Sequence, residues 1–171
     1  MVRIGLLSDT HGYTDPRLTD LFKDCDEIWH GGDFGDEKVS SDLSSIKKLR
    51  GVYGNIDGRE IRMIHPLHLV FEIEKMKVYM THIGGYPGNY FPEAKKMIEQ
   101  ERPGLFICGH SHILKVMPDK KYNLLHMNPG AAGKHGFHKM RTLIRFSIDN
   151  GKIIQPEVIE LGLRGQIDSA V

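Results

Sequence analysis

The sequence predicts an α/β fold, and three observations support this prediction. Short apolar segments at residues 2–8, 27–30 and 49–53 alternate with segments in which apolar residues recur at helical spacing. Each apolar segment ends in a polar stretch that contains glycine, as a strand does where it enters a loop. This alternation is typical of βαβ units, so we expect a parallel sheet in the first third. A length of 171 residues, 40% of them hydrophobic, favours a single domain over residues 1–171.

The elements of the first third can be placed in order. The first strand is followed by Asp15-Pro16, which predicts a helix start because aspartate caps helices and proline suits their first position. The second strand leads to a segment with Val39, Leu43 and Ile46 on one helical face, and the third strand closes at Gly54-Asn55.

The alternation of strand and helix ends near Leu67, after which the sequence predicts a hairpin and then more β-structure. Strands at 69–73 and 77–81 flank a short turn, and a helix follows from Pro92 to about Gln100. A strand at 105–108 comes next, and apolar pairs further along predict β-structure toward the end. These strands extend the α/β prediction beyond the first third.

Composition excludes several function classes. A formal net charge of +1 argues against a protein that neutralises many nucleic-acid phosphates. Phosphate-loop, serine-nucleophile and dinucleotide-binding motifs are absent from the sequence. Two distant cysteines, Cys25 and Cys108, favour a reducing cytoplasmic location, and we find neither a signal peptide nor a long apolar stretch. The unusual feature is a set of ten histidines, the commonest metal-ligating residue.

Polar residues that can bind metals follow the carboxyl ends of five predicted strands. Such ends converge in α/β folds and form the usual ligand crevice. Singly, each motif has an ordinary alternative, because aspartate is common in loops and a lone His-x-His is more often surface decoration. Together they predict one site. The residues are Asp9, His11, Asp33, Asn55, His82, His110 and His112.

In this arrangement the sequence resembles the calcineurin-like metallophosphoesterase superfamily, whose pattern is D-x-H, G-D, G-N, a histidine after a strand, and G-H-x-H. All five blocks occur here in order, and Asn128-Pro129-Gly130 follows the last of them. The short chain looks most like the small phosphodiesterases of the YfcE/MJ0936-like subfamily. The resemblance implies a four-layer αββα sandwich of two mixed β-sheets flanked by helices.

The resemblance also implies two divalent metal ions bridged by an aspartate and a water or hydroxide. Asp9, His11 and His112 would bind the first ion. Asn55, His82 and His110 would bind the second, and Asp33 would bridge them, so that Asp33, Asn55 and His82 would be catalytic. Oxygen and imidazole donors without thiolate suit transition metals, so we expect manganese first, with nickel, iron, zinc or cobalt as alternatives. The implied reaction is hydrolysis of a phosphate ester by attack of the bridging hydroxide.

Ile56 departs from a common variant of the pattern, in which a histidine after Gly-Asn protonates the leaving group. Isoleucine carries no proton, so we expect a preference for phosphodiesters with good leaving groups. His135 and His138 are possible replacements, although exposed loop positions are the simpler interpretation. We expect His65 and His68 at the surface or a strand edge, and His30 either behind a ligand or in a simple strand-end contact.

Two other functions stay open at this stage. One is a non-catalytic metal-binding scaffold on the same fold, similar to the retromer subunit that has lost an active-site histidine. The other is a nuclease acting on short oligonucleotides. We expect a small phosphate-ester substrate, no extended nucleic acid and no membrane partner, and a homo-oligomer is compatible with the sequence.

Overall fold

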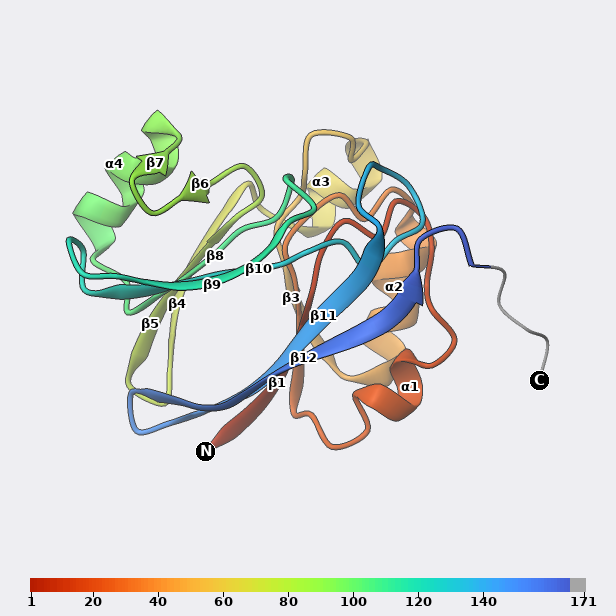
Figure 1. Cartoon of the computed structure of the whole chain (residues 1–171), viewed down its shortest axis with the longest axis horizontal. Helices are drawn as coiled ribbons and strands as arrows, with labels where there is room; N and C mark the ends of the chain where they lie inside the picture. The colour runs from red at the N-terminus through yellow and green to blue at the C-terminus, as the bar shows by residue number, and fades with distance from the viewer. Residues whose placement is uncertain (167–171) are drawn as a thin grey trace.

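Two five-stranded mixed sheets form the framework of the molecule, which the computed structural model describes for residues 1–166 (Figure 1). In the first sheet the strand order is β12-β11-β1-β2-β3, and in the second it is β4-β5-β8-β10-β9. The first sheet contains β1 (Val2–Leu7), β2 (Glu27–His30), β3 (Lys48–Gly51), β11 (Met140–Asp149) and β12 (Lys152–Leu163). The second contains β4 (His68–Ile73), β5 (Met76–Thr81), β8 (Leu105–Ile107), β9 (Leu114–Asp119) and β10 (Leu124–Pro129).

The parallel pairing predicted for the first third is confirmed. Strand β2 runs parallel to both β1 and β3, and in the second sheet β8 runs parallel to both β5 and β10. The remaining pairs, β1 with β11, β11 with β12, β4 with β5 and β9 with β10, are antiparallel. The loops after β1 and β8 meet where the N–H of His110 donates to Asp9 Oδ2 at 3.1 Å. The carboxyl ends of the parallel strands of both sheets therefore share one edge of the molecule.

The main core lies between the two sheets. Alternate residues of β1, β4, β5, β8 and β11 enter it, as the two-residue period of a strand requires. Ile4 and Leu6 of β1 pack there with Val78 and Met80 of β5, and Trp29 of β2 lies in the same cluster. The sheets thus bury a continuous apolar layer, which gives the loops above it a rigid base.

Helices cover the outer faces of both sheets and complete the four layers (Figure 1). Leu18, Leu43 and Ile61 from three helices join the cluster on the first sheet, whereas Ala94 and Ile98 from a fourth pack on the second. This confirms the αββα sandwich that the family resemblance implied. The helices are α1 (Leu18–Leu21), α2 (Glu37–Ile46), α3 (Arg59–Ile64) and α4 (Pro92–Glu101), and a small hairpin pairs β6 (Gly85–Tyr86) with β7 (Asn89–Tyr90).

The predicted hairpin and the helix after it are confirmed. Ile73 pairs with Met76 across a two-residue turn of Glu74 and Lys75, whose φ angles are 47° and 63°. Positive φ at both turn residues matches the right-handed twist of the paired strands. Helix α4 begins at Pro92, as predicted, and ends in front of Arg102, whose φ is 49°.

The helix predicted from Asp15-Pro16 is shorter than expected and begins later. Only the four residues of α1 are helical, and Pro16 and Arg17 form a turn between Asp15 and the helix. The Asp15 carboxylate makes the backbone contact expected of a cap and other contacts besides. It accepts hydrogen bonds from the backbone N–H and guanidinium of Arg17, and from Arg141 Nη1 at 2.9 Å. The Asp15 and Arg141 side chains are each 1% exposed. Aspartate at this position anchors β11 to the loop after β1, and no helix begins there.

Candidate metal centre

The seven predicted site residues all lie in loops that follow strand carboxyl ends, and the structure brings them together. Asp9 and His11 follow β1, Asp33 follows β2, Asn55 follows β3, His82 follows β5, and His110 and His112 follow β8. Five of them have φ between 46° and 69°: Asp9, His11, Asp33, His110 and His112. Non-glycine residues rarely adopt this left-handed region, and such strain concentrates at functional sites. The loops are therefore held in unusual conformations that point the side chains at one centre.

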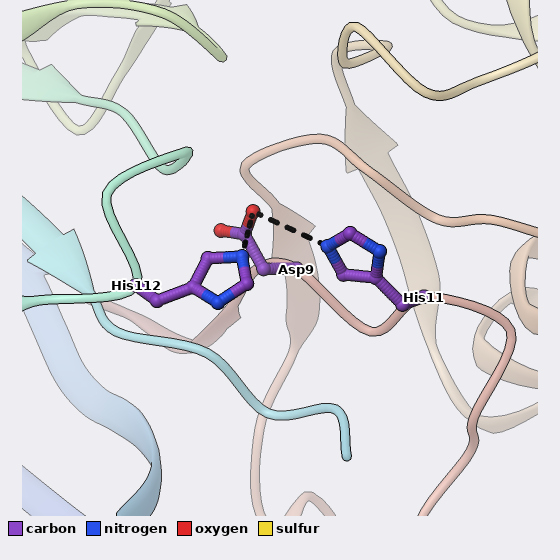
Figure 2. A group of neighbouring side chains, drawn as sticks. All are labelled: Asp9, His11 and His112. Atoms are coloured by element: carbon purple, nitrogen blue, oxygen red, sulfur yellow. Dashed lines mark ion pairs between the residues drawn. The ribbon is translucent and has the colours of Figure 1, made fainter. Parts of the chain in front are cut away.

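The first cluster consists of Asp9, His11 and His112 (Figure 2). Asp9 Oδ2 accepts hydrogen bonds from Ser8 Oγ at 2.7 Å and from the backbone N–H of His110. Its second oxygen, Oδ1, faces His112 Nε2 at 3.1 Å and His11 Nε2 at 4.0 Å. One oxygen is thus used to orient the carboxylate, and the other is directed between two imidazole nitrogens.

The second cluster consists of Asp33, His82 and His110, and it adjoins Asn55. His82 Nε2 lies 3.2 Å from Asp33 Oδ2, and His110 Nδ1 lies 3.0 Å from Asn55 Oδ1. His82 is 1% exposed, whereas His110 is exposed to solvent. The cluster is therefore closed on its inner side and accessible from outside.

Asp33 belongs to the second cluster and also approaches the first. Its Oδ1 accepts a hydrogen bond from the backbone N–H of Ile56 at 3.1 Å. Its Oδ2 lies 3.2 Å from His82 Nε2 in the second cluster and 3.6 Å from His11 Nε2 in the first. A single oxygen atom is consequently within reach of both clusters, as a bridging ligand must be.

Unpartnered buried atoms test whether these residues fit metal ions. Asp9 Oδ1, His11 Nε2 and His82 Nε2 are buried without a hydrogen-bond partner among the described residues. His82 Nδ1 donates to the carbonyl of Gly31 at 2.8 Å, which leaves the Nε2 lone pair of the neutral ring directed at Asp33. Lone pairs that face one another across a buried gap repel unless a cation lies between them. The donor set therefore fits divalent ions.

The pKa shifts of these groups are those expected where carboxylates and imidazoles are buried together. Burial lowers the pKa of His11 and of His110. Burial also acts against charge on His82, but the Asp33 and Asp9 carboxylates outweigh it and raise the pKa of this ring. For Asp33, burial is opposed by His82 and by the Ile56 N–H, which together lower the pKa of the carboxyl. Asp33 is thus held as a carboxylate.

Two glycines allow this close approach. A Cβ on Gly54 would collide with the Asp33 carboxylate, and a Cβ on Gly32 would lie 2.5 Å from His82 Nδ1. Gly32 also has a φ of 102°, which side-chain-bearing residues rarely adopt. The Gly-Asp and Gly-Asn pairs of the motif therefore have a steric explanation in this chain.

Asp57 was not predicted, yet it connects two of the site loops. It is 3% exposed, and its carboxylate accepts the backbone N–H groups of Phe34, Gly35 and Gly54 at 2.7–3.2 Å. These bonds join the loop that carries Asp33 to the loop that carries Asn55. The signal in the sequence was its position directly after Gly-Asn-Ile.

His30 and His65 form a buried stack behind the Asp33 loop. The ring of Phe34 lies between them, with centroid distances of 3.6 Å to His30 and 4.5 Å to His65. His30 accepts the N–H of Gly32 and bonds Thr10 Oγ1 at 3.0 Å, so it supports two ligand loops. The surface placement expected for His65 is wrong, because this ring is 6% exposed and bonds Ser40 Oγ at 2.8 Å. The edge placement of His68, at the start of β4, is confirmed.

His138 supports a predicted ligand from behind, a role that the sequence left open. Its Nε2 must donate to the carbonyl of Gly133 at 2.9 Å, because a carbonyl only accepts. In the neutral ring its Nδ1 then accepts from His112 Nδ1 at 3.1 Å, and burial lowers the pKa of His138, which favours that neutral ring. His112 is left with a free Nε2 lone pair aimed at Asp9. His135 is exposed, with its ring 5.0 Å from that of His11.

We expect His138→Ala to weaken divalent metal binding by roughly 10–100-fold, the usual effect of losing a partner that orients a histidine ligand. Without His138, the His112 ring loses the bond that fixes its tautomer and orientation. Titration calorimetry with Mn²⁺ on chelator-treated protein would measure the change. His126→Ala, which removes a buried histidine remote from the ligands in β10, is the control and should leave metal affinity unchanged. Wild-type affinity in His138→Ala would contradict the assigned role.

The chain belongs to the calcineurin-like phosphoesterase superfamily, since the family model of that superfamily's domain matches residues 2–151. A probable metallophosphoesterase of Methanothermobacter thermautotrophicus is 27% identical over 135 residues, which cover 75% of this chain and 76% of the relative. These matches agree with the family resemblance seen in the five sequence blocks.

Solved structures share the fold. A protein described as a novel archaeal phosphodiesterase has a TM-score of 0.69 at 21% identity, with 92% of this chain and 99% of that chain covered. Vps29 of Chaetomium thermophilum has a TM-score of 0.73 at 14% identity, covering 94% and 97%. At these identities the likeness concerns the fold alone. Within residues 1–166, none of the helices has the length and apolar character needed to cross a bilayer.

Proposed function

We propose that this protein is a dinuclear metal-dependent phosphoesterase that prefers phosphodiesters. The observation that supports this most directly is Asp33 Oδ2, which lies within 3.6 Å of imidazole nitrogens from both clusters. The three unpartnered buried atoms beside it are of the types that bind cations. The superfamily match and the names of the relatives support a phosphoesterase.

Each donor has a role in this proposal. Asp9, His11 and His112 would hold one divalent ion, and Asn55, His82 and His110 the other, with Asp33 shared. When bound, two such ions supply Lewis acidity, a lowered pKa of bound water and charge neutralisation for an in-line displacement. We propose manganese as the first choice, because the site combines hard oxygen donors with imidazole and has no thiolate.

The chain itself contributes orientation. Hydrogen bonds from Ser8 and from the His110 backbone hold the Asp9 carboxylate, and the Ile56 N–H holds Asp33. Asp57 fixes the separation of the Asp33 and Asn55 loops. Because these partners are in place before a substrate arrives, little reorganisation remains for the reaction itself.

Metal analysis coupled to an activity assay tests the proposal. The purified protein should contain about two transition-metal ions per chain and hydrolyse bis-p-nitrophenyl phosphate, as expected of a two-metal site. A chelator should abolish turnover, and added Mn²⁺ should restore it. A protein that binds metal but cleaves no ester would instead support the non-catalytic metal-binding scaffold, the alternative to which the Vps29 likeness in fold draws attention, and a protein that binds no metal would contradict both.

We expect aryl phosphodiesters to be hydrolysed faster than alkyl phosphomonoesters. Ile56 presents a half-exposed hydrocarbon side chain where a proton donor would be useful, so general acid catalysis, typically worth about 10²–10⁴-fold, is missing from this position. Parallel assays of bis-p-nitrophenyl phosphate and an alkyl phosphate would measure the ratio. Equal or reversed rates would contradict the expectation. If His135→Gln then lost the activity toward the alkyl phosphate, the His135 ring would be identified as the replacement donor.

A further inference from the structure

We propose that a pocket beside the second cluster binds an apolar, aromatic-sized substituent of the phosphate ester. This inference rests on the proposed function, because it places the phosphoryl group at the clusters. The pocket has a volume of about 530 Å³, within the usual range for small-molecule sites. Asn55 and His82 belong both to its lining and to the candidate metal centre. A group attached to a phosphate at the clusters therefore has a direct path into it.

The walls of the pocket are largely apolar. Tyr53, Leu67, Ile83 and Phe91 line it, and Phe91 is 50% exposed while Leu67 is 39% exposed. Phe91 is fixed in place by its backbone, which donates to the Gly84 carbonyl at 3.1 Å directly before α4 begins. Large apolar side chains that line a concave site beside polar groups are characteristic of ligand pockets.

Arg62 and His68, two polar residues of the lining, already have partners. Arg62 Nε donates to the Asp57 carbonyl at 2.7 Å, and its guanidinium lies 4.6 Å from the centroid of the Tyr53 ring. His68 bonds Glu93 at 3.1 Å, and its other nitrogen bonds the Tyr79 hydroxyl at 3.0 Å. These contacts use part of the polar capacity of the lining, and a hydrocarbon ring would lie against surface that is already apolar. The pocket therefore selects for an apolar group.

Two phosphonates that cannot be hydrolysed provide the test. Phenylphosphonate and methylphosphonate present the same anionic group to the clusters and differ in the substituent alone. Titration calorimetry on the metal-loaded protein should give a dissociation constant at least about 10-fold lower for the phenyl compound, a modest value for a ring in an apolar pocket. This readout needs no turnover.

Variants of the pocket lining test whether the preference for phenylphosphonate arises there. Phe91→Ala and Leu67→Ala should each reduce the phenyl preference to a few-fold at most while leaving methylphosphonate binding unchanged. Phe137→Ala is the matched control, because Phe137 is a fully exposed phenylalanine outside the pocket lining, and it should keep the wild-type preference.

The possible failures are distinct. Equal binding of the two phosphonates by the wild-type protein, or a preference that survives in both pocket variants, would overturn the pocket and leave the phosphoesterase proposal standing. Failure of the metal-loaded protein to bind either phosphonate would overturn both, because the anionic group would then have no site at the clusters.

Discussion

Asp33→Asn should lower kcat/KM for bis-p-nitrophenyl phosphate by about 10³-fold or more, because the carboxylate serves both clusters at once. Asparagine keeps the shape of the side chain and can still accept the Ile56 N–H. It places either an N–H donor or a neutral oxygen where Oδ2 now faces His11 and His82. The variant should also retain less than the wild-type content of metal, measured by elemental analysis.

Folding should be nearly unaffected by this substitution, so circular dichroism and thermal unfolding should match the wild type. Asp24→Asn, which neutralises an exposed carboxylate in the loop before β2, should retain full activity. His82→Ala should behave like Asp33→Asn, since it removes a buried donor from the second cluster. Wild-type turnover in Asp33→Asn or His82→Ala would refute the assigned site.

Arg141→Met should destabilise the protein by about 3 kcal/mol or more, the largest stability effect that we expect from a single change. The substitution leaves the Asp15 carboxylate buried without its inner partner, and it removes one of the two guanidinium donors to the Leu161 carbonyl, Arg141 Nη2 at 2.9 Å, the other being Arg17 Nη2. Arg17 still contacts Asp15, but that side chain is half-exposed and screened by solvent. Urea unfolding would measure the loss.

A surface pair provides the control. Arg3→Met breaks the contact of Arg3 with Asp26, whose side chains are 49% and 45% exposed, and should cost less than about 1 kcal/mol. Similar losses in the two variants would show that burial does not decide the strength of the Asp15 interaction.

The same buried pair predicts an acid-sensitive contribution to stability. Burial alone would raise the pKa of Asp15, but Arg17 and Arg141 lower it from 3.8 to about 2. A carboxyl with a depressed folded-state pKa stabilises the fold above its unfolded value and loses that contribution as protons bind. Stability should therefore fall between about pH 4 and pH 2, and Asp15→Asn should remove this part of the slope in urea unfolding measured across that range.

Local patterns in the sequence were sufficient for most of the fold. The apolar run of β1 and the turn at Glu74-Lys75 are features of neighbouring residues, so their structures were predictable. Helix α3 was missed because it has six residues, of which Ile61 alone is buried, and such a segment has no readable periodicity. The helix expected at Asp15 begins three residues later, and the bond of Asp15 to Arg141, 126 residues away, leaves no local signal in the sequence.

The candidate site shows the same difference between signals from neighbouring residues and contacts between distant residues. The seven donors could be proposed because each stands next to a strand end in the chain. His65 and His138 could not, because their partners are distant in sequence and are brought close by the fold alone, and Asp57 had only its position after Gly-Asn-Ile as a signal. His65 bonds a residue 25 positions earlier, and His138 bonds one 26 positions earlier. Supporting residues of this kind leave no motif.

The meeting of the two sheets at a common edge has a mechanical consequence. Each cluster takes donors from both sheets: His112 comes from the second and joins two residues of the first, while His82 and His110 join Asp33 and Asn55. Under the proposed function, each ion would link loops of the two sheets to one another. Ligands that bind the folded state alone stabilise it by mass action. Metal supply in the cell would then govern how long the protein persists as well as how fast it works.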